Sequence, residues 1–175
     1  MRNAAAFALA ALAAAGPVRA HPDGAPWKAS GRPGCVQCHF DAPPTEDSTA
    51  IAIGGLPERV EPGASYRLTV RLSDAAMRKA GFLLSAWQGS EPGGSFRPAD
   101  DRVTANAAQA RSTLAGAGVD ERGIVEWLID WIAPQKSGEL VTLELWANAA
   151  NDDASPLGDE THHRTWSVAV AGARP

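Results

Sequence analysis

The chain has few cysteines, no long apolar run and no excess of basic residues, and each shortage excludes a class of protein. Two cysteines among 175 residues cannot form the several bridges of a disulfide-rich secreted scaffold. No uncharged apolar run reaches the roughly 20 residues that a membrane-spanning helix needs. Lys and Arg number 16 against 20 Asp and Glu, so nucleic acid is not expected as a partner.

Motifs of hydrolytic enzymes are also missing from the sequence. There is no G-x-S-x-G nucleophile elbow, no phosphate-binding glycine loop and no H-E-x-x-H zinc motif. The carboxylates show no placement that singles out an acid/base pair. We therefore expect no hydrolytic activity and assign no catalytic residue.

The N-terminus has the pattern of an export signal. Arg2 precedes an uncharged Ala, Leu and Phe run at 4–15, and the tripeptide at 18–20 has small residues where a signal peptidase cleaves. We predict a signal peptide over residues 1–20, cleavage after Ala20, a periplasmic or secreted protein and no transmembrane segment after cleavage. The signal holds two arginines and no acid, so 14 basic and 20 acidic residues remain, a net charge of about −6. An acidic surface of this kind suits a basic protein partner.

Both cysteines lie in the pentapeptide Cys35-Val36-Gln37-Cys38-His39, which has the spacing of a c-type haem attachment site. In such a site the two thiols bond covalently to one haem, and the adjacent imidazole ligates the iron. We therefore predict one haem c, attached through Cys35 and Cys38, with His39 as the proximal iron ligand. Covalent attachment of c-type haem takes place outside the bacterial cytoplasm, so the motif and the export signal support each other.

Other roles for the C-x-x-C pair remain open. The pair could be a thioredoxin-like redox pair, a structural disulfide or part of a metal site without haem. A thioredoxin motif lies between a strand and a helix, whereas turn residues at 31–34 and 42–45 flank this pair. A zinc site built from two cysteine pairs would need a second pair, which the chain lacks.

The sixth iron ligand would decide whether such a haem carries electrons or binds small ligands. The candidates are Met77, His21, His162 and His163. The two adjacent histidines precede the last expected strand as the haem motif precedes the first, and in many immunoglobulin-like sandwiches these two strands run side by side. His163 or His162 could therefore reach the iron as the distal ligand, and the alternative is that both are solvated histidines on a loop. We expect Met77 to cover one end of the core.

Two further metal sites are conceivable. If cleavage makes His21 the first residue, its amine and imidazole could bind copper together with a second histidine. The loop from Asn148 to Glu160 is rich in Asn, Asp and Glu, whose oxygens are calcium ligands, although no spacing matches an EF-hand. The same composition is common in hairpin loops.

From about residue 49 the sequence alternates apolar and polar residues in short runs separated by turn residues, which predicts an antiparallel all-β sandwich. The predicted strands are residues 50–54, 65–73, 81–87, 94–97, 123–132, 140–147 and 165–170. Residues 105–114 do not fit, because their alanines favour a short helical turn. We expect an irregular haem-attachment arm over 21–48 and an immunoglobulin-like sandwich over 49–175.

Several phrases of the sequence are informative when they are taken together. They are GLPERVEPGASYRLTV (55–70), AGFLLSAW (80–87), GSFRP (94–98), WLIDWIAP (127–134) and VTLELWANAAND (141–152), and the tripeptide GAP (24–26) precedes the CVQCH motif. In this order they resemble the Reeler-like β-sandwich domain of bacterial extracytoplasmic proteins, the group described as choice-of-anchor V. The resemblance implies an immunoglobulin-like sandwich with a haem-type motif before its first strand, and little about activity.

The combined expectation is an exported mono-haem c-type cytochrome module that exchanges electrons with a protein partner and is not an enzyme. The alternative is a non-redox extracytoplasmic binding or adhesion sandwich in which Cys35 and Cys38 form a disulfide. A third hypothesis is a haem-based ligand sensor or a peroxidatic site.

Overall fold

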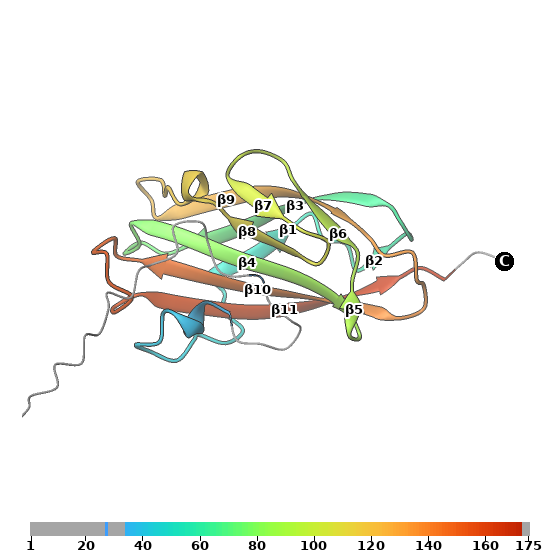
Figure 1. The fold of residues 1–175 in the computed structure, drawn as a ribbon, viewed down its shortest axis with the longest axis horizontal. Helices are drawn as coiled ribbons and strands as arrows, with labels where there is room; N and C mark the ends of the chain where they lie inside the picture. The colour runs from blue at the N-terminus through green and yellow to red at the C-terminus, as the bar shows by residue number, and fades with distance from the viewer. Residues whose placement is uncertain (1–26, 28–33, 173–175) are drawn as a thin grey trace, which may run out of the picture.

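The computed structural model describes Trp27 and residues 34–172, which form two β-sheets packed face to face (Figure 1). One sheet has four strands, in the order β1 (Ile51–Gly54), β3 (Ser65–Ser73), β9 (Ile124–Ile132) and β6 (Ser95–Pro98). The other has seven, in the order β2 (Arg59–Val60), β11 (Glu160–Val170), β10 (Leu140–Ala150), β4 (Lys79–Gln88), β8 (Gln109–Ser112) and β7 (Val103–Ala105), with β5 (Glu91–Pro92) paired to β4. The predicted all-β sandwich is confirmed.

Strand β3 shows how the alternating pattern produces this architecture. Leu68, Val70 and Leu72 point into the core and are fully buried. Arg67 and Arg71 point the other way and form ion pairs with acidic side chains of β9, the strand that pairs with β3. Because successive side chains of a strand face opposite sides of the sheet, this sequence can bury its aliphatic side chains only by covering one face.

Two tryptophans of β9 form the centre of the core. Trp127 and Trp131 are both fully buried, and the ring of Trp127 lies 4.8 Å from that of Phe82 in the opposite sheet. Each indole N–H donates to a backbone carbonyl, Trp127 to Gly116 at 2.8 Å and Trp131 to Gly93 at 3.0 Å. Both tryptophans are therefore core residues whose polar atoms are satisfied.

The beginning of the sandwich runs parallel to its last strand. β2 pairs with β11 in parallel, and Thr45 forms a parallel bridge with His162. Backbone hydrogen bonds join Thr45 to Thr161 and His163. The first strand itself, β1, pairs with β3 in the other sheet, so the expectation holds only for the segments on either side of it. The bridge at Thr45 still brings the haem-type motif and the histidine pair to the same end of the molecule.

Residues 105–114 do not form the helical turn expected from their alanines. The segment forms the end of β7 and the whole of β8, with Asn106 Oδ1 accepting hydrogen bonds from two backbone N–H groups in the turn. Ala110 is fully buried on the inner face of the sheet, where it pairs with Leu84 of β4. Pairing with a neighbouring strand outweighs the small helix propensity of alanine. A single 3₁₀ turn, η2 (Leu114–Gly116), follows β8.

The predicted signal peptide over 1–20, and all of residues 21–33 except Trp27, lie outside the described residues. Over the part of the chain that the structure describes, no helix has the length and apolar character needed to cross a membrane.

Candidate functional site

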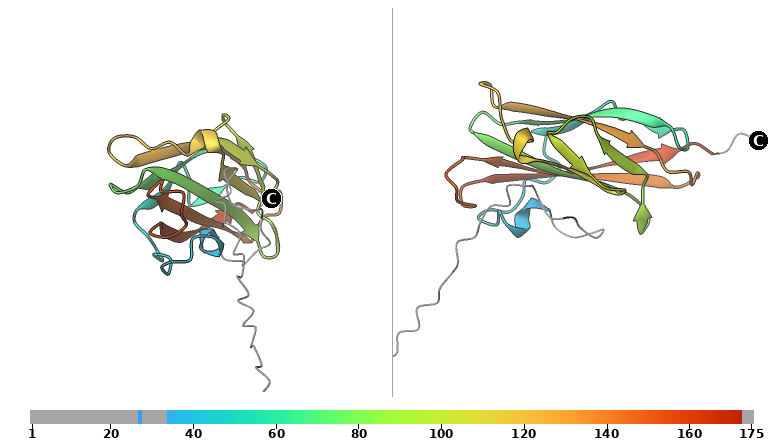
Figure 2. Two further views of the ribbon diagram at one scale, coloured as in Figure 1. Left: turned by 60° about the vertical axis from the view of Figure 1, so that its left-hand side comes forward. Right: turned by 45° about the horizontal axis from the view of Figure 1, so that its top comes forward.

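The CVQCH motif lies on the outer face of the seven-stranded sheet. The 3₁₀ turn η1 (Cys35–Gln37) lies against this face (Figure 2). Cys35 forms an apolar cluster there with Leu83 of β4 and Trp146 of β10. Gly34 allows this close approach, because a Cβ at this position would lie 2.1 Å from Cγ of Trp146. Further along the same face, the guanidinium of Arg111 lies 4.2 Å from the ring centre of Trp27.

The turn holds the three chemically active side chains of the motif close together. The backbone N–H groups of Cys38 and His39 both donate to the carbonyl of Cys35, at 3.1 and 3.0 Å. Cys35 is buried, whereas Cys38 and His39 are half-buried. The two sulfur atoms are not joined in a disulfide. The arrangement presents two thiols and an imidazole from one compact turn.

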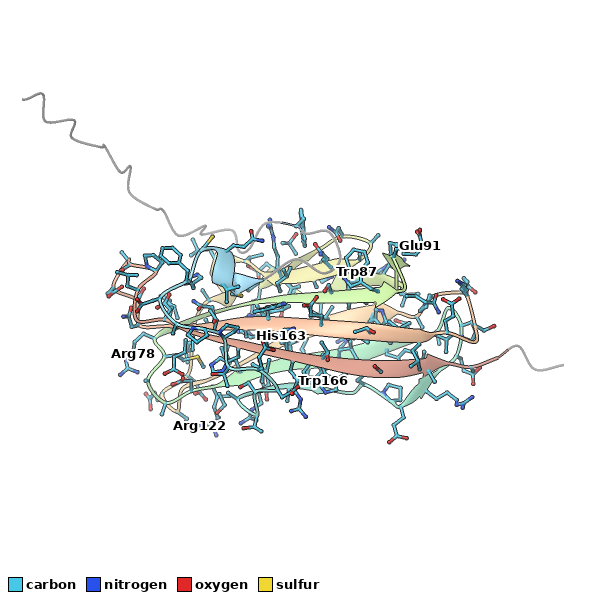
Figure 3. The ribbon with its side chains drawn as sticks, turned by 90° about the horizontal axis from the view of Figure 1, so that it is seen from below. Arg78, Trp87, Glu91, Arg122, His163 and Trp166 are labelled. Atoms are coloured by element: carbon cyan, nitrogen blue, oxygen red, sulfur yellow. The ribbon has the colours of Figure 1, made fainter. Side chains whose placement is uncertain are left out.

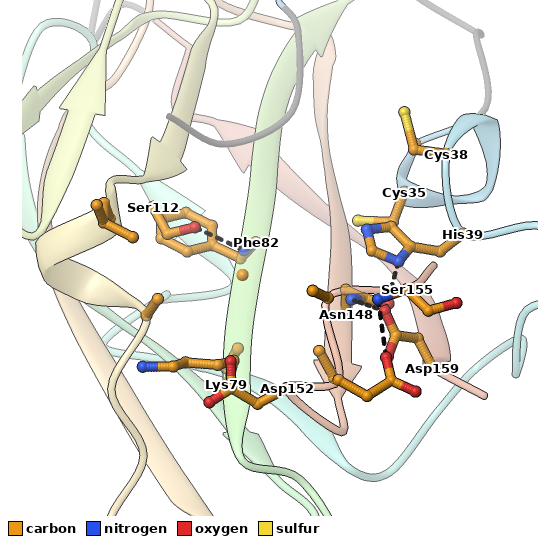
Figure 4. Close-up of a pocket in the computed structure, with 18 of the residues that line it drawn as sticks. Cys35, Cys38, His39, Lys79, Phe82, Ser112, Asn148, Asp152, Ser155 and Asp159 are labelled. Atoms are coloured by element: carbon orange, nitrogen blue, oxygen red, sulfur yellow. Dashed lines mark hydrogen bonds and ion pairs between the residues drawn. The ribbon is translucent and has the colours of Figure 1, made fainter. Parts of the chain in front are cut away.

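A buried carboxylate orients the imidazole of His39. His39 Nδ1 lies 2.7 Å from Oδ2 of Asp159, which is only 6% exposed. Asp159 also accepts hydrogen bonds from Nδ2 of Asn148 at 3.3 Å and from the backbone N–H of Asn151 at 3.2 Å. When Nδ1 donates to Asp159, the ring presents the lone pair of Nε2 on its other side, away from the carboxylate (Figure 4).

No sequence pattern predicts this role for Asp159. In the sequence, Asp159 is one of several acidic residues of a loop that lies 120 positions from His39. Among the described residues of that loop, Asp159 is the one whose side chain forms a hydrogen bond with the motif. Nothing in the local sequence distinguishes it from Asp152 and Asp153.

A pocket of about 320 Å³ lies beside the motif. Cys35, Cys38 and His39 lie on one side of it, and Phe82 of β4 and Ser112 of β8 lie across from them (Figure 4). Leu114 of η2 is also part of the lining. We call this the CxxCH pocket. Its volume lies at the lower end of the range of roughly 300–1,000 Å³ typical of small-molecule sites. Leu114 is 64% exposed, so the pocket has an apolar rim that is open to solvent.

Three candidates for a sixth iron ligand, Met77, His162 and His163, are described by the structure, and none of them lines the CxxCH pocket. His163 lies over the strands of the seven-stranded sheet in the view of Figure 3. It stacks on Trp146 with ring centres 4.1 Å apart, and its two nitrogens contact Glu46 and Glu144. Met77 is buried in the core between the sheets, as expected for a residue that covers one end of the sandwich. His21 lies outside the described residues. Among the described residues that line the pocket, His39 is the only histidine, and none is a methionine.

His162 points to the opposite face of β11, into the sandwich. It is 4% exposed, and its Nδ1 lies 3.0 Å from the hydroxyl of Ser48. Burial lowers the pKa of the His162 imidazole below its ordinary value, and the nearby carboxylates of Glu160 and Asp74 oppose this shift in part. The imidazole is therefore neutral near pH 7.

The acidic loop between β10 and β11 uses many of its side chains to hold its own backbone. Asn151 and Asp153 accept hydrogen bonds from N–H groups two residues further along the chain, and Ser155 does the same for Leu157. Asp152 and Ala154 have positive φ angles of 64° and 63°. These turns account for the Asn and Asp content of the loop, and calcium binding by it stays a prediction.

Comparisons with known proteins identify the fold. No family model matches the chain, and a search of curated proteins finds no match. Among solved structures, the Reelin-N domain of F-spondin is similar with a TM-score of 0.53 and 19% identity, covering 78% of this chain and 97% of that chain. The human F-spondin reeler domain has a TM-score of 0.52 and 18% identity, covering 73% of this chain and 95% of that chain. The chain therefore has a Reeler-like fold.

Proposed function

We propose that this protein is an exported mono-haem c-type cytochrome module that exchanges electrons with a protein partner. Cys35 and Cys38 would attach the haem, and His39 would ligate its iron. The observation that carries the proposal is the hydrogen bond between Nδ1 of His39 and the buried Asp159, which leaves Nε2 available beside an open pocket flanked by both thiols. The location outside the cytoplasm, with cleavage after Ala20, is part of the same proposal.

The residues present fit such a group. Histidines that ligate metals usually donate their other ring N–H to a carboxylate or carbonyl, which orients the ring and makes the ligating nitrogen more basic. Asp159 supplies this carboxylate, and Asn148 and the backbone of Asn151 fix its position. Leu114 and Ala117 provide apolar surface elsewhere in the lining. The pocket therefore combines the two thiols, an oriented imidazole and apolar walls.

A bound haem would supply a one-electron redox couple, and the chain's own residues would set its environment. Asp159 orients His39 and strengthens it as a ligand. The half-buried Cys38 and the exposed Leu114 leave the pocket accessible from one side. Electrons can pass between a haem and a partner protein only where the partner can approach the edge of the haem. The open side of the pocket therefore supports electron exchange with a partner.

The test of the proposal is a pyridine haemochrome spectrum of the full chain expressed together with a c-type haem maturation system. We expect one haem per chain that stays attached to the denatured protein, with the haemochrome spectrum of two thioether links. A purified, folded protein without covalent haem under these conditions would retire the cytochrome proposal.

A haem-free extracytoplasmic binding module is the second candidate, and the Reeler-like fold favours it. A small-ligand or peroxidatic haem site is the third, and it is favoured because the described pocket lining contains no histidine other than His39. The haemochrome test separates the second candidate from the first. The reduced spectrum with and without carbon monoxide separates the third, because an open iron position binds carbon monoxide whereas an iron with two strong protein ligands does not.

Replacement of Asp159 by asparagine should change the properties of the iron without removing the haem. An amide keeps the shape of the side chain but loses the charge that makes His39 a stronger ligand. We expect the reduction potential to rise, and His39 to be displaced by added imidazole at concentrations on the order of 10- to 100-fold lower. Spectroelectrochemical titration and an imidazole titration measure these effects.

Asp152→Asn is the matched control for this variant. Asp152 is an exposed carboxylate that lines the same pocket, so its replacement makes the same change in charge. We expect little shift in potential and no change in the imidazole titration. Equal shifts in the two variants would show that Asp159 acts only through its net charge, and would contradict the orienting role given to it here.

A further inference from the structure

Three potential ligands meet on the inner face of the sandwich, at the end where β11 begins. They are Asp74, from the turn between β3 and β4, and Glu160 and His162, from β11. One ligand atom from each lies within 4.8 Å of the ligand atoms of the other two. His162 is 96% buried, since its exposure is 4%, and its Nε2 has no hydrogen-bond partner among the described residues. A buried ring nitrogen without a partner is costly unless something binds it.

The imidazole is held in a defined orientation. The hydroxyl of Ser48 lies 3.0 Å from Nδ1 and also accepts a hydrogen bond from the backbone N–H of Ala50 at 3.2 Å. The backbone of His162 forms a parallel bridge with Thr45. With Nδ1 donating to Ser48, Nε2 is left as a lone-pair donor. This is the outer contact that metal-ligating histidines usually make.

The two carboxylates can complete a coordination sphere. One oxygen of Asp74 accepts the backbone N–H of Ala76 at 2.7 Å, which fixes the side chain and leaves the other oxygen available. Glu160 is exposed, so its side chain can rotate toward His162 at low cost. Zinc–ligand bonds are about 2.0 Å long, and this rotation lets the Glu160 carboxylate adjust to that distance.

We propose that Nε2 of His162 and one carboxylate oxygen each from Asp74 and Glu160 bind a divalent transition-metal ion of the Zn²⁺ class. One imidazole with two carboxylates suits zinc better than calcium or magnesium, which prefer all-oxygen sites. Two carboxylates neutralise the charge of the ion.

The site is separate from the CxxCH pocket. Asp159 and Glu160 are neighbours in the chain, but successive side chains of a strand point to opposite faces. Asp159 contacts His39 on the outer face, and Glu160 lies with His162 on the inner face. The ion would join the β3–β4 turn to the start of β11, two segments about 90 positions apart in the sequence. This use of His162 favours a role for it outside the haem site.

The test is isothermal titration calorimetry of the full chain with ZnCl₂ alone, after treatment with a chelator. The protein carries Cys35→Ser and Cys38→Ser so that the thiols do not compete for zinc. We expect one zinc per chain, and the d–d absorption of Co²⁺ at the same site should report nitrogen and oxygen ligands. Asp74→Asn and Glu160→Gln should each weaken zinc binding at least tenfold. Both positions are at the surface, so these variants are expected to fold, which circular dichroism checks.

His163→Gln is the matched control, because it removes the adjacent histidine on the opposite face of β11. It should bind zinc with the affinity of the parent protein. Absence of zinc binding by the parent would overturn the proposal. Unchanged zinc affinity in both Asp74→Asn and Glu160→Gln, or a loss in His163→Gln as large as theirs, would overturn it as well.

Discussion

Replacing both Cys35 and Cys38 by serine is expected to abolish covalent haem attachment, so that haem staining of the denatured protein falls to background. Serine has nearly the same size as cysteine but forms no thioether with a haem vinyl group. The single variants should retain one thioether each and show a haemochrome band shifted to longer wavelength. The measurements are haem staining after denaturing electrophoresis and the pyridine haemochrome spectrum, each normalised to protein.

Val36→Ala is the matched control for the cysteine variants. Val36 lies between the two cysteines in η1 and packs against the cluster of Cys35, Leu83 and Trp146, so its truncation disturbs the same turn without removing a thiol. We expect haem attachment to be retained. Equal haem content in the double serine variant and the parent would show that haem is held elsewhere or without covalent bonds, and would refute the assignment.

Replacement of Trp127 by alanine should give the largest loss of stability among single core variants. The indole is fully buried, packs on Phe82 at 4.8 Å and donates to the carbonyl of Gly116. Its removal leaves a cavity and an unpaired buried carbonyl, so the free energy of unfolding should fall by about 3–5 kcal/mol. Urea unfolding followed by circular dichroism measures this change.

Leu128→Ala provides the comparison for Trp127. Leu128 is the next residue of β9 and faces the opposite side of the sheet, where it is 39% exposed. Its truncation should lower the free energy of unfolding by less than about 1 kcal/mol, as is usual for a substitution at a partly exposed position. Similar losses in the two variants would contradict the burial pattern on which the sandwich rests.

The strands with regular alternation could be predicted from the sequence almost residue by residue. Residues 65–73 match β3, and residues 123–132 differ from β9 by one residue. β11 is longer than the predicted 165–170, because it begins at Glu160 in a polar stretch whose pairing with β10 no local pattern reveals. Residues 105–114 were predicted wrongly as a helical turn, since alanine propensity is weak compared with pairing to a distant strand.

Some residues of the candidate site could likewise be predicted from the sequence, and others could not. Cys35, Cys38 and His39 are recognisable from the sequence because their chemistry depends on spacing within a single turn. Asp159 could not be recognised, because it reaches His39 only after β10 and β11 have paired and η1 has docked on their outer face. The distal role predicted for His163 or His162 stays a prediction, although the structure places one against Glu46 and Glu144 and the other inside the sandwich.

The sequence by itself determined the class of the fold and the position of the haem-type motif, because both follow from patterns with a short period. The tertiary structure alone decided what surrounds that motif. The carboxylate behind His39, the pocket beside it, and the opposite orientations of His162 and His163 depend on contacts between segments more than 100 positions apart. Such contacts are set by how strands pair and which face they cover, and a one-residue change of register would reverse every one of them.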